Sequence, residues 1–182
     1  MEKKSLPLGE VYGLLEPGPV VLLTTAGAGS KGQRPNVMTL SWHMMMEFEP
    51  PLVACLVSAN DYSFELLRAS GECVLNIPTV DIAAQVVACG NSHGRRTDKF
   101  KATGLTPMPA SRVGAPLIDE CYAGLECVVH DDGWVERYNL FVLEVVAAWV
   151  DKGRRRPRTL HHRGWGEFFV AGPGLRLPSA MR

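Results

Sequence analysis

Polar and aromatic side chains that could hold a flat ligand gather in one short segment, residues 36–43. The segment combines the amide of Asn36 with hydroxyls, an imidazole and the indole of Trp42. A double proline, Pro50-Pro51, and the apolar run 52–57 follow it. Strand-like residues on both sides would place the polar groups beside a stiff β surface. The pattern therefore indicates a wall for a planar ring that also forms hydrogen bonds.

An isoalloxazine ring would match such a wall, because it has a hydrogen-bonding edge and a large apolar face. Backbone amides beside Thr39 and Ser41 are suited to bind the ring edge or N5, and Trp42 to cover part of the ring. Met45, close behind, is expected to lie against the ring as well. The alternative is structural: Thr39, Ser41 and His43 would face outward from a strand, and Trp42 would belong to the core.

A polar loop at residues 90–100 offers groups for a terminal phosphate. Phosphate requires backbone N–H groups, hydroxyls and cations that converge on one point. The loop supplies these types within eight residues: Ser92, Gly94, Arg95 and Lys99. The alternative is a solvated charged face in which Asp98 pairs with one of the cations. Neither a G-x-G-x-x-G after a strand nor a Walker motif is present, which excludes Rossmann and P-loop readings.

Length and charge narrow the class of protein. The 182 residues predict one domain, residues 1–182, with a loosely ordered tail from about residue 172. A formal net charge of zero argues against binding to nucleic acid or to an anionic membrane surface. The N-terminus lacks the apolar stretch of a signal peptide, and no apolar run approaches the roughly 18 residues that span a bilayer. We therefore expect a cytoplasmic protein.

Cysteine and histidine patterns do not indicate a disulfide framework or a metal site. The five cysteines are odd in number, none has C-x-x-C spacing, and most lie in apolar runs, so we expect reduced, buried thiols. Cys89 is notable because it borders the polar loop. His161 and His162 would point to opposite faces of a strand and cannot easily chelate one ion. A G-x-S-x-G elbow for Ser-His-Asp hydrolysis is absent.

Strand patterns dominate the chain. We expect strands at 20–25, 38–48, 52–57, 73–77, 121–130, 138–150 and 168–170. Residues 26–32 read as a hairpin loop, and the Asp-Gly in 131–134 as a second hairpin cue. Short helices are expected after Asn60-Asp61, at 81–88 and at 98–102. Many strands with a few inserted helices predict a closed or split β-barrel.

The order of these motifs resembles the flavin reductase-like family with the FMN-binding split barrel, particularly its flavoredoxin-like branch. The resemblance covers about residues 15–150. The matching segments are Pro35-Asn36-Val37-Met38-Thr39, Ser41-Trp42, Pro50-Pro51, Tyr62-Ser63-Phe64-Glu65-Leu66-Leu67, Gly71-Glu72-Cys73-Val74-Leu75-Asn76-Ile77-Pro78, Gly94-Arg95 and Asp98-Lys99-Phe100. It implies a mainly β, six-stranded Greek-key barrel that dimerises and binds FMN near the dimer interface. The long apolar strands at 125–129 and 141–150 are consistent with a large shared face.

The resemblance also implies a set of FMN-binding residues. Ser63 stands where the family often has threonine and is expected to contact the phosphate or the ribityl chain. His93 stands where the family often has serine, and Arg96 where it often has an acidic residue. The expected cofactor-binding residues are Asn36, Met38, Thr39, Ser41, Trp42, Met45, Ser58, Ser63, Ser92, His93, Gly94, Arg95 and Lys99, with no catalytic acid or base and no metal ligand.

Three functions share such a site. The first is an NAD(P)H-dependent flavin reductase, in which hydride passes to flavin N5. The second is an electron carrier with tightly held FMN, as in flavoredoxin-like relatives, with an unknown electron acceptor. The third is a binding protein on the same barrel that has lost redox turnover. Fold alone does not choose among them.

Overall fold

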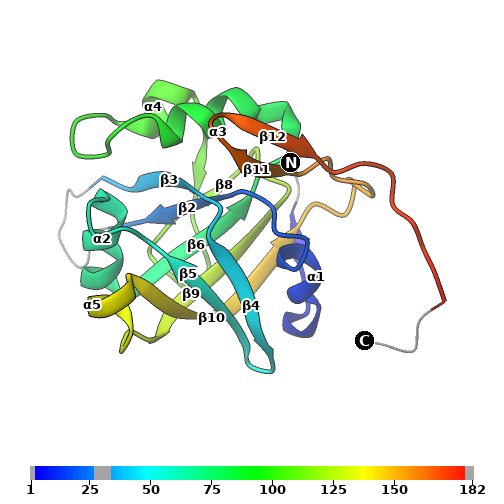
Figure 1. The fold of residues 1–182 in the computed structure, drawn as a ribbon, viewed down its shortest axis with the longest axis horizontal. Helices are drawn as coiled ribbons and strands as arrows, with labels where there is room; N and C mark the ends of the chain where they lie inside the picture. The colour runs from blue at the N-terminus through cyan, green and yellow to red at the C-terminus, as the bar shows by residue number, and fades with distance from the viewer. Residues whose placement is uncertain (1–2, 27–33, 179–182) are drawn as a thin grey trace.

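The computed structural model describes residues 3–26 and 34–178, and most strands within these ranges join one antiparallel sheet that curls into a barrel (Figure 1). The predicted 26–32 turn lies almost wholly outside the described residues. Counted over the described residues, the sheet has eight strands, where the resemblance implied six. They are β1 (Lys4–Ser5), β2 (Val21–Thr25), β3 (Asn36–Leu40), β4 (His43–Phe48), β5 (Pro51–Leu56), β6 (Glu72–Ile77), β9 (Ala123–Asp131) and β10 (Leu140–Val150).

The order of strands explains why the barrel is split. Neighbours follow the path β3-β2-β6-β9-β10-β5-β4, and β1 pairs with the end of β10. β3 and β4 are consecutive in the chain, yet they form opposite ends of this path. The chain therefore crosses from one edge of the sheet to the other at Ser41-Trp42. The expectation of a mainly β split barrel with short helices is confirmed.

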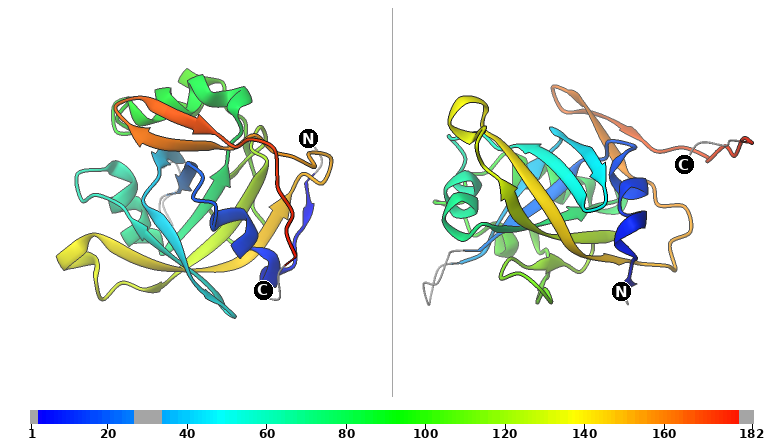
Figure 2. Two further views of the ribbon diagram at one scale, coloured as in Figure 1. Left: turned by 45° about the vertical axis from the view of Figure 1, so that its right-hand side comes forward. Right: turned by 90° about the horizontal axis from the view of Figure 1, so that it is seen from below.

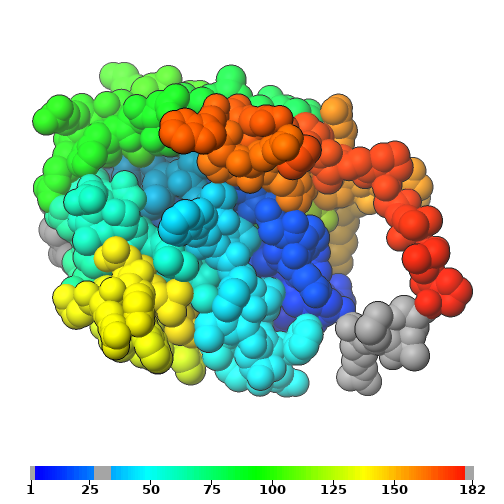
Figure 3. Space-filling model, in the orientation of Figure 1, coloured from blue at the N-terminus to red at the C-terminus, as the bar shows by residue number. Residues whose placement is uncertain are grey.

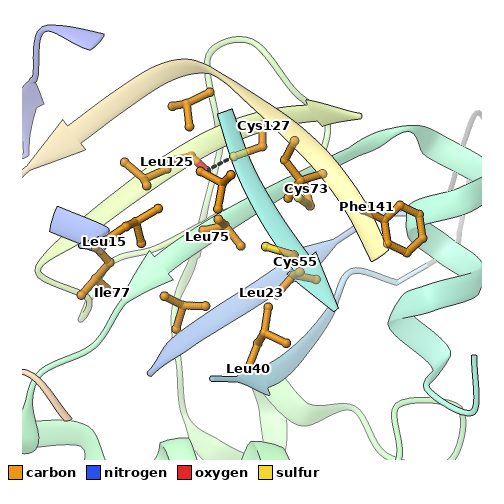
Figure 4. Packing of buried hydrophobic residues seen from close by; sticks show 14 of the residues in the cluster. Leu15, Leu23, Leu40, Cys55, Cys73, Leu75, Ile77, Leu125, Cys127 and Phe141 are labelled. Carbon is orange, nitrogen blue, oxygen red and sulfur yellow. Dashed lines mark hydrogen bonds between the residues drawn. The ribbon is translucent and has the colours of Figure 1, made fainter. Parts of the chain in front are cut away.

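The principal core fills the barrel and draws side chains from most of its strands (Figure 4). Leu23, Leu75 and Leu125 meet there from β2, β6 and β9, and Phe141 from β10. All five cysteines are free and buried, which confirms their predicted role as small apolar residues. Burial raises the pKa of the Cys55 thiol well above its ordinary value, so this thiol stays protonated in the core.

Short helices cover the outside and the ends of the barrel (Figures 1 and 2). They are α1 (Tyr12–Leu15), α2 (Tyr62–Ser70), α3 (Ala83–Gly90), α4 (Lys99–Thr103) and α5 (Val135–Tyr138), with 3-10 turns η1 (Leu8–Glu10) and η2 (Val80–Ile82). α2 ends at Gly71 in the left-handed conformation, as its sequence predicts. α4 begins at Asp98, whose carboxylate accepts from the Lys101 N–H at 3.1 Å.

Two short strand pairs lie outside the barrel sheet: β7 (Pro107–Met108) with β8 (Leu117–Ile118), and β11 (Leu160–Gly164) with β12 (Glu167–Val170). Leu160 and Phe168 of the β11–β12 hairpin pack on Val86 and Cys89 of α3 in a second apolar cluster. Figures 1 and 2 show this hairpin beside α3, with the tail 171–178 leading away from it. The tail has no regular secondary structure at residues 171–178. Its loose order from about residue 172 stays a prediction.

Two sequence-based expectations need correction. The predicted strand 38–48 is two strands, because the chain changes sheet edge at Ser41-Trp42. The predicted 131–134 hairpin is not a tight turn, because the helix α5 connects β9 to β10. Val135 of this helix is buried at 1% exposure and packs against the core of the barrel. β9 and β10 pair with each other and lie between β6 and β5. A shared dimer face on residues 125–129 and 141–150 stays a prediction.

No helix within residues 3–26 and 34–178 has the length and apolar composition needed to cross a membrane. A location in the cytoplasm and the division of the chain into a single domain stay predictions.

A buried carboxylate anchors the long connection between α4 and β9. Glu126 on β9 is fully buried, and its oxygens accept from the Ser111 N–H at 2.9 Å, the Arg112 N–H at 2.5 Å and the Trp149 indole at 2.7 Å. Burial alone would raise the pKa of Glu126, but these donors together lower it below its ordinary value of 4.5. The charged form thus fixes the loop against the sheet.

We expect Glu126→Gln to lower the free energy of unfolding by about 3 kcal/mol, because the amide accepts fewer hydrogen bonds and sets its own donors against those of the loop. Urea unfolding at pH 7 measures the loss. The difference from the parent should shrink as pH falls below about 4.5, because the carboxylate takes up its proton there in the unfolded chain and only at lower pH in the folded protein. Glu136→Gln, at an exposed ion pair with Arg68, is the control and should change stability little. Equal stability of parent and Glu126→Gln would contradict the anchor.

Candidate functional site

A pocket of about 450 Å³ opens where the chain crosses the split. It is called the split pocket here. Its floor is the end of β3 and the crossing itself, and its rim comes from the ends of β5 and α5. The lining residues are Met38, Thr39, Leu40, Ser41, Trp42, Leu56, Ser58, Asp61, Tyr138 and Asn139. Five of the predicted site residues therefore meet: Met38, Thr39, Ser41, Trp42 and Ser58.

Trp42 stands at the rim rather than in the core. Its side chain is 69% exposed, which contradicts the purely structural alternative for this residue. Thr39 faces outward from its strand but not into open solvent, because its hydroxyl donates to the Val86 carbonyl of α3 at 2.5 Å. That bond fastens α3 to β3 directly behind the pocket floor. Met45 differs from its expected position. It packs against the principal core, and it lines neither the split pocket nor the pocket under the β11–β12 hairpin.

A buried polar contact ties the start of β3 to the start of α2. The Asn36 amide donates to the Ser63 hydroxyl at 2.8 Å, and their exposed fractions are 4% and 1%. Gly94 of the polar loop completes the contact, because a Cβ at this position would overlap the Asn36 side chain. Three segments that are distant in sequence thus converge on one amide.

The cation end of the site surrounds a small hollow of about 60 Å³, called the loop hollow here. Tyr62, Gly94 and Arg95 line it, together with Arg34, Pro35, Thr97 and Asp98. The Arg95 guanidinium lies 4.9 Å from the centre of the Tyr62 ring and forms an ion pair with Glu65. His93 accepts the Arg95 N–H at its Nδ1 at 3.3 Å, which shapes the loop. Arg95 is half exposed, so it is oriented yet accessible.

Lys99 does not join Arg95 at the loop hollow. Its side chain is 6% exposed, and its ammonium donates to the Cys89 carbonyl at the end of α3 at 2.8 Å. Burial lowers the pKa of Lys99, against the opposing effects of Cys89 and Asp61. The Ser92 hydroxyl is also engaged, since it donates to the Ala88 carbonyl at 2.8 Å. In this structure both residues brace the loop.

The α2 N-terminus connects the two ends of the site. Asp61 lines the split pocket, Tyr62 lines the loop hollow, and Ser63 lies buried beside Asn36. The first turn of a helix presents unpaired N–H groups and a positive dipole end. An elongated ligand with a flat ring at one end and an anion at the other would match this layout.

A second pocket of about 310 Å³ lies behind the same crossing, under the β11–β12 hairpin; we name it the hairpin pocket. Its lining residues are Val20, Thr39, Ser41, Val86, Val87, Gly90, Asn91, His162, Gly166 and Phe168. Thr39 and Ser41 belong to both pockets. Sequence reasoning treated His162 only as a metal candidate and gave Phe168 only a strand. No local motif marks their place, because the hairpin reaches the site through a long-range contact with α3.

Comparisons with known proteins agree with this geometry. The flavin reductase like domain matches residues 14–167. The chain belongs to the flavin reductase like family. A relative from Escherichia coli K12, the uncharacterized protein YddH, is 36% identical over 171 residues, which cover 87% of this chain and 89% of the relative.

Solved structures of the family share the fold. An FMN-binding domain of a flavin reductases-like enzyme from Shewanella baltica has a TM-score of 0.88 and 24% identity, with 97% of this chain and 98% of that chain covered. Flavoredoxin of Desulfovibrio vulgaris (Miyazaki F) has a TM-score of 0.80 and 24% identity, with coverages of 90% and 91%. The predicted family and fold are thereby confirmed, whereas the roles of individual residues stay predictions.

We expect Gly94→Ala to disrupt the contact among β3, α2 and the polar loop. The new methyl group must displace the Asn36 amide, and overpacking of this kind costs about 2 kcal/mol. Thermal unfolding of the ligand-free protein measures the loss. Gly13→Ala is the matched control, since a Cβ there meets nothing within 4 Å. If the two variants prove equally stable, the close approach of Gly94 to Asn36 is not a constraint on this fold.

Proposed function

We propose that this flavin reductase like protein is an FMN-dependent oxidoreductase that accepts electrons from NAD(P)H. The observation that carries the proposal is the pair of pockets that share Thr39 and Ser41. A ring held in the split pocket would lie next to a second ring held in the hairpin pocket. Two-electron transfer between a flavin and a nicotinamide requires such adjacency.

The residues of the split pocket fit a flavin ring. Its volume lies within the roughly 300–1,000 Å³ of small-molecule sites. Met38, Leu40 and Leu56 supply apolar surface, whereas Thr39, Ser41 and the crossing backbone supply polar groups for a hydrogen-bonding edge. The Trp42 indole, at the rim, would cover part of the ring. FMN, when bound, supplies the redox chemistry, and these residues bind and orient it.

The loop hollow and the start of α2 fit the phosphate end. Arg95 and Arg34 are accessible cations there, and the Tyr62 ring and the Glu65 carboxylate hold the Arg95 guanidinium in place. Ser63 retains a hydroxyl proton that it can donate while it accepts from Asn36. Lys99 would act on the phosphate only indirectly, by holding the Cys89 carbonyl and the loop.

The hairpin pocket favours an enzyme over a dedicated electron carrier. A carrier requires only that the flavin edge be reachable, whereas this pocket offers room for a second molecule beside Thr39 and Ser41. Val86, Val87 and Phe168 form apolar walls for a flat ring, and His162 places an imidazole at the margin. The reduced nicotinamide of NAD(P)H would match these walls, because it is a flat ring with one amide.

A homodimer would complete the split pocket. Met44 and Met46 are 61% and 48% exposed on β4, an edge strand of the sheet, and Trp42, just before that strand, is 69% exposed. Large exposed apolar side chains beside a pocket are typical of an interface. The face that β4 presents, rather than β9 and β10, is therefore the one proposed to meet a second copy.

The proposal predicts that the purified protein binds FMN and oxidises NADH or NADPH when FMN is present. Flavin absorbance after purification and quenching of added FMN fluorescence measure the binding, and steady-state NAD(P)H oxidation measures the turnover. Bound FMN without turnover would favour the electron carrier. A protein that neither carries nor binds FMN would refute the proposal.

A separate measurement tests whether Arg95 binds the phosphate of FMN. Arg95→Gln should weaken FMN about tenfold, because a charge-assisted bond to phosphate is lost. Riboflavin lacks the phosphate and should bind this variant and the parent alike. Glu65→Gln removes the partner of Arg95 but keeps the cation, so FMN should bind at least as well as to the parent. An equal loss of affinity for FMN and for riboflavin in Arg95→Gln would mean that Arg95 supports the fold and does not bind the phosphate.

The dimer predicts that Met44→Glu, which places a charge in the proposed interface, gives a monomer and weakens FMN at least several-fold. Light scattering at micromolar concentration reports the mass. Leu177→Glu, on the exposed tail, is the control and should stay dimeric. A parent protein that is itself monomeric under these conditions would rule out the interface.

A further inference from the structure

The tip of the β11–β12 hairpin holds a tryptophan in an unfavourable position. Gly164 and Glu167 are paired, so Trp165 and Gly166 form a two-residue turn. Both have positive φ, 53° at Trp165 and 80° at Gly166, as in a type I′ turn. Asn, Asp or Gly normally occupies the first of these positions, since bulky side chains are disfavoured at positive φ. Trp165 is therefore not explained by the needs of the turn.

Packing does not explain Trp165 either. Its relative exposure is 106%, the highest among the large apolar side chains of the described residues. A side chain that lies in water adds no burial to the core. No packing of Trp165 therefore offsets the cost of its positive φ. Backbone strain at an exposed aromatic residue points to a ligand or partner rather than to the fold.

The position of the turn shows where such a ligand would lie. Gly166, the next residue, lines the hairpin pocket, and so do His162 and Phe168 of the same hairpin. Figure 3 shows the hairpin in orange on the face of the molecule that also carries β3 and β4. Trp165 thus stands at the outer margin of the pocket proposed for the nicotinamide ring.

The hairpin pocket is too small to hold the whole NAD(P)H molecule that is proposed as the electron donor. About 310 Å³ is at the lower limit of small-molecule sites, enough for a nicotinamide and its ribose but not for a whole dinucleotide. The purine end must therefore lie over the surface beyond the hairpin. A purine is a flat base, and an exposed indole is a good stacking platform for it.

We propose that Trp165 is a specificity residue that stacks on the purine of the dinucleotide donor. The inference rests on the proposed function, since it assigns the second half of the same substrate. Trp165 itself lines neither pocket, so it would act on binding of the donor and not on the transfer step.

Steady-state kinetics of the FMN-loaded protein with two donors test this. Reduced nicotinamide mononucleotide has the nicotinamide but no purine, whereas NADH and NADPH have both. Trp165→Asn keeps a residue that tolerates positive φ and removes the indole. We expect KM for the dinucleotide to rise about tenfold with kcat unchanged, and KM for the mononucleotide to stay the same. Trp165→Phe should fall between parent and Trp165→Asn.

Phe169→Asn is the matched control. Phe169 is an exposed aromatic residue of the same hairpin at 55%, under the Arg163 guanidinium, and it lines neither pocket. It should leave KM for both donors unchanged. An unchanged dinucleotide KM in Trp165→Asn, an equal rise for both donors, or a change of oligomeric state would overturn the assignment of Trp165 alone. Absence of turnover with every nicotinamide donor would overturn the proposed function and this inference with it.

Discussion

The constraint on which the site depends is the topology of the sheet. Two strands that follow each other in sequence, β3 and β4, cannot pair because they end the sheet at opposite edges. The two-residue crossing between them leaves the hydrogen-bonding ladder, although the Trp42 carbonyl still accepts from the Leu56 N–H at 3.0 Å. Backbone polar groups that leave a ladder require other partners, such as side chains, water or a ligand. The split is therefore both the gap in the barrel and the place proposed for a polar ligand.

Buried polar contacts keep the crossing in register with the elements around it. The Asn36–Ser63 contact holds β3 to α2, and the Thr39 hydroxyl holds β3 to α3. On the next strands, the Asn76 amide donates to the Leu22 carbonyl and accepts the Ile118 N–H, which fixes the β8 segment on the sheet. Such contacts are costly to break because each partner would be left unsatisfied in the core. They make the position of Thr39 and Ser41 a consequence of the whole barrel.

Most of the fold and about half of the candidate site could be predicted from the sequence. The rest could not, for a physical reason. Alternation and local stop signals identify strands such as β2 and β6 and the helix α2, since these depend on neighbours in the chain. The break at Ser41-Trp42 gives no such signal, because it arises from sheet order. Lys99 illustrates the same limit for the site: its charge was visible in the loop, but its burial against Cys89 depends on how α4 packs on α3. His162 and Phe168 escaped notice because their pocket forms between segments more than sixty residues apart.

The candidate site is open because few side chains of the barrel cover it. The side chains that would normally close such a cavity, Trp42 and Tyr138, are 69% and 47% exposed at the rim of the split pocket. Large aromatic residues lose much of the free energy of burial in this position, about 25 cal/mol for each Å² of apolar surface left in water. A fold that tolerates this cost at one face, while burying Glu126 and Asn76 with full sets of partners elsewhere, separates its stability from its binding surface. The barrel supplies the stability, and the split edge stays available for the cofactor and for the proposed donor and second copy.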